Sequence, residues 1–553
     1  MKGDIKKIRE GYYEKADLTE TLSGIPIKEI YRPEDINNIE YHRDIGDPGK
    51  FPYTRGIYPN MFRGRFWTRR EVCGFGTPAD TNKRLLQQIE MGVTGLNVIV
   101  DMPTRFGVDV EHPLAKGEVG ATGVPLTSLR DMEVLTKGIP IKDVSFSLIS
   151  SSCVAPIVLS QYIIVAKRAG VDISKIRGTI QSDTLSTRFC GMGDATPPDL
   201  ALKITGDIIE FCSRYMPLWY PINVNMYDLR ETGISAPQEL GFGFANAIAY
   251  IEEVLRRGLN IDDFAPRFAF YCSSHIDFFE EIAKLRAARR MWAKILKDRF
   301  KAKNPKSWKF RFGIHTAGCS LVAKQPINNI IRVTIEALAA VLAGVQSLHC
   351  CSYDEPIALP NETTQKIAIR TQQIIAYETG AAATADPLGG SYYIETLTNK
   401  IEEEAWKILK KIDDMGGAIE AIKNKWIEKE IEKEALRYQR SIENGERIVV
   451  GVNAFVEEEE EKELEIRPHR YSFEAERRHI NNVKRLKQER DKERLERAKE
   501  NLRKEALKGR NHNLIPAIID AVEAYATTDE IIGTIRECFG YSYDPFNINK
   551  SPF

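Results

Sequence analysis

Short runs rich in apolar and β-branched residues alternate with long amphipathic stretches from about residue 85 to residue 395. The runs read GLNVIVD, DVSFSLISSS, RGTIQSD, INVNMYD, PRFAFYCSS, KFRFGIHT and GVQSLHCCS. The stretches between them have helical periodicity, as in QELGFGFANAIAYIEEVLRRG. Strands that alternate with helices predict a parallel sheet. Seven runs are present and TTQKIAIRTQQIIAYETG leads toward an eighth unit, so the α/β chain is predicted to form a closed (β/α)8 TIM barrel rather than an open doubly wound sheet.

The regions that flank this pattern differ from it, and 553 residues are more than one ordinary domain needs. We expect an extended, partner-contacting N-terminal arm over residues 1–50, the barrel over 51–395, a helical extension over 396–455, and an acidic linker with a charged helical C-terminal tail over 456–553. The acidic run Glu457–Glu461 is typical of a solvated linker. Residues 473–508 are dominated by Arg, Lys and Glu, which predicts an exposed helix or, less favoured, a partner-contacting one.

The charge is balanced, with 78 basic and 78 acidic residues, which gives no indication of a nucleic-acid or anionic-membrane partner. The nine cysteines include no C-x-x-C spacing, which favours free thiols in a reducing compartment. The N-terminal sequence MKGDIKKIREGYYEK lacks the apolar run of a secretory signal, and no stretch of about 18 apolar residues is present. We therefore expect a cytoplasmic protein without a membrane partner.

Polar residues gather where the predicted strands end, and in barrels of this kind those ends carry the catalytic groups. They are Asp101, Ser150–Ser152, Gln181, Asp183, Asp228, Ser273–His275, His315 and Cys350–Cys351. This set contains no metal-ligand pattern, no G-x-S-x-G motif and no P-loop. The strands also carry small Ser, Thr and Asn residues where Val, Ile and Leu usually fill a barrel, which would leave room along the axis.

Asp228 and His315 each have two interpretations. The sequence DLRE, which begins at Asp228, fits a helix N-cap with Glu231 as the partner in a capping box. The position of Asp228 at a strand end suits an active-site carboxylate equally well. His315 fits either a hydrogen-bonded core histidine or a member of the site.

Long ordered motifs, among them GIYPNMFRGRFWTRR, GFGTPADTN, HPLAKGEVG, FFEEIAKLRAARRMWAK, QSLHCCSYDEPIALP and DPLGGSYY, span about residues 50 to 455. In these the chain closely resembles the large, catalytic subunit of the methylmalonyl-CoA mutase family. The resemblance implies a (β/α)8 barrel with CoA along its axis, and an adenosylcobalamin-derived radical that drives a 1,2 carbon-skeleton rearrangement of an acyl-CoA. The family's cobalt-ligating D-x-H-x-x-G signature is not found here. That implies a separate small cobalamin-binding subunit, no metal ligand from this chain, and a heterotetramer or a homodimer of the large subunit.

The resemblance assigns residues to three groups. The CoA group is Tyr58, Met61, Arg65, Thr68, Arg70, Asn97, Thr179, Arg267 and Ala269. The cobalamin- or adenosyl-facing group is Val100, Thr122, Cys190, Gly318, Glu355 and Ala358. The substrate pocket is Val72, Val100, Gln181, Gly191, Asp228 and His315. Lys306 and Glu355 both match positions near the radical carrier.

The pocket departs from the family pattern at several of these positions. Val72 replaces a tyrosine, Val100 an aromatic near the corrin, and His315 a glutamine. Gly191 stands where an arginine pairs the free carboxylate of methylmalonyl-CoA, and Asp228 where a histidine hydrogen-bonds the thioester carbonyl. A substrate carboxylate would lose its cation and meet a like charge, so free methylmalonyl-CoA is a poor candidate.

Several substrates and one non-catalytic role stay open at this point. A hydroxylated acyl-CoA is the sharpest hypothesis, with Asp228 accepting a hydrogen bond from a hydroxyl or amine or pairing with His315. With an aliphatic residue at position 72, the chain resembles the 2-hydroxyisobutyryl-CoA enzymes. Those enzymes, however, have an acidic residue where this chain has Ile99. The alternatives are a branched acyl-CoA resembling isobutyryl-CoA, a true methylmalonyl-CoA mutase with compensating changes, and a non-catalytic CoA-binding paralogue. The retained Gln181, Lys306 and Glu355 argue against the paralogue, and the altered Asp228 and His315 argue for it.

Overall fold

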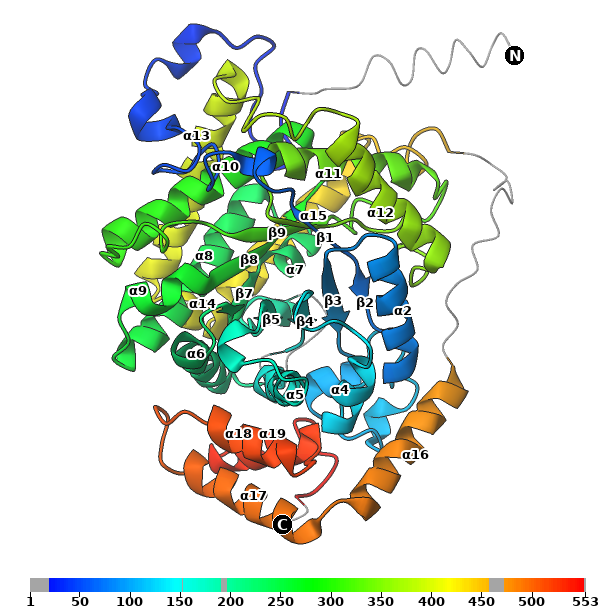
Figure 1. The fold of residues 1–553 in the computed structure, drawn as a ribbon. Coiled ribbons are helices and arrows are strands. Elements are labelled where there is room, and N and C mark those ends of the chain that lie inside the picture. Colours follow the sequence, from blue (N-terminus) through cyan, green and yellow to red (C-terminus); the bar gives the residue numbers. More distant parts are fainter. Residues whose placement is uncertain (1–18, 152, 190–195, 457–471, 552–553) are drawn as a thin grey trace.

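The computed structural model describes residues 19–151, 153–189, 196–456 and 472–551. Parallel strands occupy its centre and helices surround them (Figure 1). One five-stranded sheet has the order β1 (Thr68–Arg70), β10 (Ser347–His349), β9 (Phe312–Thr316), β8 (Phe268–Ser274) and β7 (Ile222–Asn225). The other has the order β2 (Val72–Cys73), β3 (Gly95–Ile99), β4 (Ser145–Ile149), β5 (Gly178–Gln181) and β6 (Trp219–Tyr220).

The two sheets share their terminal strands. Only Glu71 separates β1 from β2, and only Pro221, which has no N–H to donate, separates β6 from β7. Every pairing between neighbouring segments is parallel. Because β1 and β2 are two parts of one strand, and β6 and β7 two parts of another, the ten segments form eight strands in one ring. This is the (β/α)8 barrel that the alternating pattern predicts.

The eighth strand does not lie where the sequence pattern placed it. The stretch TTQKIAIRTQQIIAYETG forms helix α12 (Glu362–Tyr377), which follows the last strand. The missing strand is the first one, Thr68–Cys73, which precedes the alternating region. Its three charged residues, Arg69, Arg70 and Glu71, conceal it from a search for apolar runs.

Helices alternate with the strands around the ring. Those of the barrel are α2 (Pro78–Glu90), α3 (Met102–Phe106), α4 (Leu129–Leu135), α5 (Ala155–Arg168), α6 (Pro198–Tyr215), α7 (Met226–Glu231), α8 (Ala236–Arg256), α9 (Ile261–Phe264), α10 (Phe278–Lys294), α11 (Asn328–Leu342) and α12. The extension contains α13 (Tyr392–Asp414), α14 (Ala418–Lys423) and α15 (Trp426–Glu443). Capping boxes at Thr77, Ser128 and Ser235 begin three of the barrel helices.

Side chains alternate between the two faces of each strand, and the two faces differ sharply. Outward residues such as Leu96, Leu148, Phe270 and Ile314 belong to two large apolar clusters between the strands and the helices. The inward positions are mostly small or polar; they include Gly95, Asn97, Ser145, Ser147, Thr179, Asn223, Ala269, Gly313 and Ser347. Four of these nine, Gly95, Asn97, Ser147 and Asn223, are buried, and the other five keep partial access to solvent. The axis is therefore polar and not filled by large apolar side chains.

The C-terminal tail folds back onto the barrel as α16 (Phe473–Glu489), α17 (Lys492–Ala506), α18 (Ile515–Glu523) and α19 (Thr528–Cys538). Figure 1 shows these helices beside α4 and α5. Leu502 is fully buried and shares one apolar cluster with Ile518 and with Ile157 of α5. The expectation of an exposed helix over 473–508 is thus wrong for its apolar face, because sparse leucines at helical spacing suffice to dock it. Glu457–Glu461 lies outside the described residues.

The described part of the N-terminal arm is tied to the start of α10. The amide of Leu22 donates to Asp277 Oδ2 at 2.8 Å, the Ser23 hydroxyl donates to Glu280, and Ile25 joins the larger apolar cluster. Two short helical turns, Pro33–Ile36 and Tyr41–Ile45, follow. Among the described helices, none is long and apolar enough to cross a bilayer.

Candidate active site

Four rings meet at the carboxyl ends of β7 to β10. The His315 ring stacks on Tyr227 with centroids 4.2 Å apart and lies 4.0 Å from His349, and Tyr227 lies 5.7 Å from Tyr271. His315 Nδ1 is 2.7 Å from the Thr316 carbonyl oxygen. Burial, followed by the neighbouring His349, holds the pKa of His315 well below its ordinary value, so its ring is neutral at pH 7. Of these four residues, only His315 was predicted from the sequence as a site residue. Tyr227, Tyr271 and His349 lie near strand ends that the sequence pattern located, but they were not predicted.

Asp228 does not cap a helix. Helix α7 begins at Met226, and its N-cap is Asn225, whose Oδ1 accepts the Asp228 N–H at 3.1 Å. The interpretation of Asp228 as an N-cap is therefore wrong, because the strand passes into the helix three residues earlier than DLRE indicates. Asp228 is the third residue of α7 and is partly exposed.

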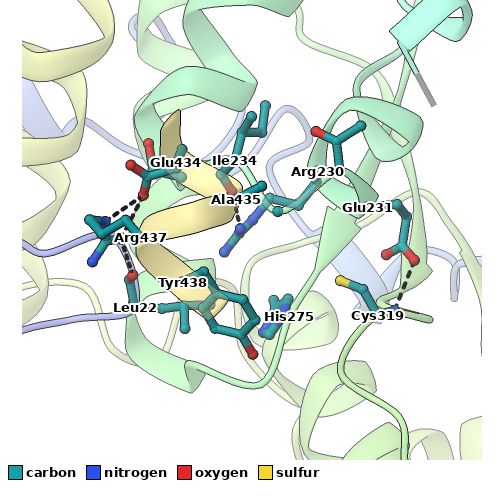
Figure 2. A pocket seen from close by; sticks show the side chains of 13 residues that line it. Leu22, Arg230, Glu231, Ile234, His275, Cys319, Glu434, Ala435, Arg437 and Tyr438 are labelled. Carbon is teal, nitrogen blue, oxygen red and sulfur yellow. Dashed lines mark hydrogen bonds and ion pairs between the residues drawn. The ribbon is translucent and has the colours of Figure 1, made fainter. Parts of the chain in front are cut away.

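Glu231 has a bridging role instead of the capping-box role expected for it. Its carboxylate accepts the N–H groups of Gly318 at 3.2 Å and Cys319 at 2.8 Å, which joins α7 to the loop after β9. Figure 2 shows Glu231 and Cys319 in contact at one side of a cavity of about 230 Å³ that also has Arg230, His275 and Tyr438 in its wall.

Carboxyl groups make the barrel mouth acid-rich. Burial, with Asp228 nearby, raises the pKa of Glu231 to about 7. Burial and then the charges of Asp354, Glu71 and Glu231 also raise the pKa of Glu355 to about 7, although this side chain reaches solvent at the rim. Further negative charge at this mouth is therefore disfavoured.

Arg70 lies across the axis below the mouth. Its guanidinium donates to Ser347 Oγ at 3.0 Å, to the Leu96 carbonyl at 3.0 Å, to Asn97 Oδ1 at 3.3 Å and to Ser145 Oγ at 2.9 Å. All these acceptors are neutral. Burial lowers the pKa of Arg70 to about 10, which still leaves it a cation at pH 7. The axis thus contains one positive charge, which is stabilised by hydrogen bonds to neutral hydroxyl, carbonyl and amide oxygens.

A basic entrance lies at the opposite, amino-terminal end of the barrel. Lys309 Nζ lies 5.5 Å from the centre of the Tyr58 ring. The pKa of Lys309 is lowered mainly by burial, and further by the nearby charges of Arg311 and Lys306. Arg267 lies over Tyr220, 5.2 Å from the ring centre. Lys306 precedes β9, whereas Glu355 follows β10, so the two lie at opposite ends of the barrel and cannot serve one radical carrier together.

The loop that carries Tyr58 is anchored from within. Buried Arg289 donates to the carbonyl oxygens of Tyr53 and Thr54, and these contacts fix the start of the loop. Met61 is buried beneath it, with Gly56 and Gly344 close by, and Arg65 is exposed.

The remaining predicted residues divide between the mouth and the ring. Val100 is buried after β3, Val72 is half-buried on β2, and the carbonyl of buried Gln181 accepts the Ser150 hydroxyl at 3.1 Å. Thr68, Asn97, Thr179 and Ala269 face the axis, Thr122 is exposed, and Gly318 and Ala358 lie in loops after β9 and β10. Cys190 and Gly191 lie outside the described residues, as does Ser152.

The axis fits a slender polar ligand. The Thr179 and Tyr271 hydroxyls are buried at inward positions and have no hydrogen-bond partner in the described structure. Buried polar groups are normally satisfied, so these two point to a ligand in the axis. At the carboxyl end of the barrel, Gly318 and Ala358 are small and partly exposed, and Val100 is buried.

Comparison with known proteins gives this geometry a family. The methylmalonyl-CoA mutase family model matches residues 20–541. The chain is 40% identical over 527 residues to the 2-hydroxyisobutanoyl-CoA mutase large subunit of Aquincola tertiaricarbonis, which covers 95% of this chain and 93% of that protein. It is 36% identical to the methylmalonyl-CoA mutase of Rhizobium meliloti (strain 1021), covering 94% of this chain and 72% of that protein, and 36% identical to the human mitochondrial methylmalonyl-CoA mutase, covering 97% and 70%. The chain therefore belongs to the methylmalonyl-CoA mutase family, whose members are generally cobalamin-dependent, and it is an acyl-CoA mutase, an isomerase.

Proposed function

We propose that this chain is the large subunit of an adenosylcobalamin-dependent mutase that rearranges the carbon skeleton of a hydroxylated or branched acyl-CoA. The observation that carries the proposal is the acid-rich mouth, where the carboxyl groups of Glu231 and Glu355 lie close enough for the charge of Glu231 to help raise the pKa of Glu355. An acyl group with its own carboxylate would add a third negative charge beside them. A neutral acyl group meets no such penalty.

A hydroxylated acyl group is the favoured substrate. The carboxylate of Asp228 accepts hydrogen bonds when ionised, so it suits a substrate hydroxyl. Val72 gives the same pocket an aliphatic wall, and His315 is neutral. The likeness to a protein named 2-hydroxyisobutanoyl-CoA mutase large subunit supports this choice.

The same likeness supports a separate small cobalamin-binding subunit, because that relative is itself named a large subunit. Bound adenosylcobalamin supplies the radical that starts the rearrangement. The residues of this chain hold the substrate: Lys306, Lys309 and Arg267 attract the phosphates of CoA at the entrance, and Arg70 and Thr179 line the axis. Gly318 and Ala358 are the surface against which the cofactor would lie, with Val100 buried at the same end of the barrel. We propose a heterotetramer or a homodimer of this chain as the assembly, with residues 1–50 in contact with a partner.

The test is to reconstitute the chain with a small cobalamin subunit and adenosylcobalamin and to add acyl-CoAs one at a time. Electron paramagnetic resonance reports coupled cob(II)alamin and organic-radical signals. We expect a signal with hydroxylated or branched acyl-CoAs and none with methylmalonyl-CoA. A strong methylmalonyl-CoA signal contradicts the proposed substrate class, and silence from every acyl-CoA favours the non-catalytic paralogue.

Asp228→Asn separates the two neutral substrates. The amide can also accept a hydrogen bond, but it lacks the charge, and hydrogen bonds to charged groups contribute about 1.5–3 kcal/mol. We expect kcat/KM for a hydroxylated acyl-CoA to fall about tenfold or more, with little change for isobutyryl-CoA. Exposed Asp298→Asn, remote from the mouth, is the matched control. Equal losses on both substrates contradict a role for Asp228 in reading the hydroxyl.

A further inference from the structure

The buried hydroxyl of Tyr271 has no hydrogen-bond partner in the described part of the chain. Tyr271 faces the axis from β8 and is in register with Asn225 of β7 and Gly313 of β9. Leaving such a group unsatisfied is energetically costly, so a buried hydroxyl is normally paired. Because the side chain faces the axis, a ligand bound there can supply the partner.

Tyr271 lies between the axis and the mouth. The Tyr271 ring is edge-on to His315, with centroids 6.0 Å apart. Asp228 at the mouth and Arg70 lower in the axis both lie near enough to influence the pKa of Tyr271. Gly313 lies beside the ring, and a Cβ there would make only an ordinary 3.4 Å contact with Tyr271 Cδ2.

Every acyl-CoA has one polar group at the junction of CoA and acyl chain, the thioester carbonyl, which only accepts hydrogen bonds. An ionised Asp228 cannot donate to it. His315 places Nδ1 against the Thr316 carbonyl, so in the neutral ring Nδ1 carries the proton and Nε2 is an acceptor. Tyr271 is therefore the donor that these groups leave available, and burial raises its pKa, which keeps the proton on the oxygen.

We propose that Tyr271 is a substrate-binding residue whose hydroxyl donates a hydrogen bond to the thioester carbonyl oxygen of the bound acyl-CoA. The inference rests on the proposed function because it needs an acyl-CoA in the axis. It assigns the recognition of the thioester to β8, separate from the role of Asp228 toward the acyl substituent in the proposed function.

The experiment measures binding of two ligands to the full-length chain by calorimetry, without cofactor or turnover. One is isobutyryl-CoA, and the other is the S-isobutyl thioether of CoA, in which a CH₂ replaces the carbonyl. Tyr271→Phe removes only the hydroxyl. We expect it to weaken thioester binding about 3- to 10-fold, as one neutral hydrogen bond predicts, and to leave thioether binding unchanged.

Tyr162→Phe is the matched control. The Tyr162 hydroxyl is also buried without a described partner, but it lies on α5 in the helix layer, against Trp219. Neither ligand should bind this variant differently. Equal weakening of thioester and thioether by Tyr271→Phe, or of neither, overturns the proposal.

A third ligand, 2-hydroxyisobutyryl-CoA, distinguishes the two oxygens that Tyr271 could contact. The proposal requires the same loss for this ligand as for isobutyryl-CoA; a loss confined to the hydroxylated ligand overturns it. The proposed function can fail while this proposal holds. In that case no acyl-CoA gives a radical signal, but Tyr271→Phe still weakens thioester binding selectively. Absence of binding by the wild-type chain overturns both.

Discussion

The carboxyl of Glu71 lies 3.2 Å from Nδ1 of His349, and both side chains are buried. The Val72 N–H donates to the same Nδ1 at 3.2 Å, so this nitrogen is an acceptor and His349 is neutral. Burial lowers the pKa of His349 to about 3 and raises that of Glu71 well above its ordinary value. The pair is therefore one of neutral groups, a carboxylic acid and an imidazole, directly behind His315.

Glu71→Gln should change how stability depends on pH. The native chain holds a proton on Glu71 that the unfolded chain releases above about pH 4.5, so this group lowers the free energy of unfolding as pH rises toward its raised pKa. Within that window each pH unit contributes about 1.4 kcal/mol. The amide keeps the shape and the bond from Gln372 but does not titrate.

Urea unfolding at pH 5 and pH 8 measures this effect. We expect the wild type to lose more stability than Glu71→Gln between the two values, with exposed Glu432→Gln following the wild type. Parallel losses in all three proteins contradict a buried neutral Glu71.

The alternation of apolar runs and helices was enough to predict the barrel. Seven strands were found because their outward residues, such as Phe146 and Ile314, fill the layer beneath the helices. The first strand was missed because its inward Arg70 and its Glu71 are paired only by residues distant in sequence. Local patterns cannot reveal such partners.

The site was predicted in part. The strand ends did locate Asp228 and His315, but the capping motif placed the start of α7 three residues late. Family resemblance grouped Lys306 with Glu355, which the topology separates. Tyr271 gave no sequence signal, since an unpartnered hydroxyl becomes visible only when the whole ring closes around it.

The tail should be part of the cooperative fold. Leu502 of α17 is fully buried in the cluster that includes α5, whereas Leu507, just past the end of the same helix, is 66% exposed. Leu502→Ala removes buried apolar volume and is expected to reduce the free energy of unfolding by about 2–5 kcal/mol. Leu507→Ala should change it by less than about 0.5 kcal/mol. Chemical denaturation followed by circular dichroism gives both values, and equal effects would mean that the tail does not dock in solution.

The basic entrance should recognise the phosphates of CoA. Lys306 is exposed beside Lys309 and Arg311, so it is expected to act through charge at some distance. Lys306→Ala should weaken CoA binding about 3- to 10-fold at low salt, and the difference should shrink as salt screens it. Calorimetry at 50 and 300 mM salt measures this, with exposed Lys433→Ala as the control. A loss that does not depend on salt would argue against a charge role.

Gly95 should keep the axis open for the ligand. A Cβ at Gly95 would lie 2.8 Å from both Arg70 Cζ and Thr68 Cγ2, whereas at Gly313 the nearest contact would be an ordinary 3.4 Å. Gly95→Ala must therefore displace the guanidinium from Leu96 and Asn97 into the axis, and overpacking of this kind typically costs about 1–3 kcal/mol. We expect CoA binding to weaken about tenfold or more in Gly95→Ala, and by clearly less in Gly313→Ala. If the two variants bind CoA alike while both remain folded, the ligand does not pass Arg70, and the axis is not its path.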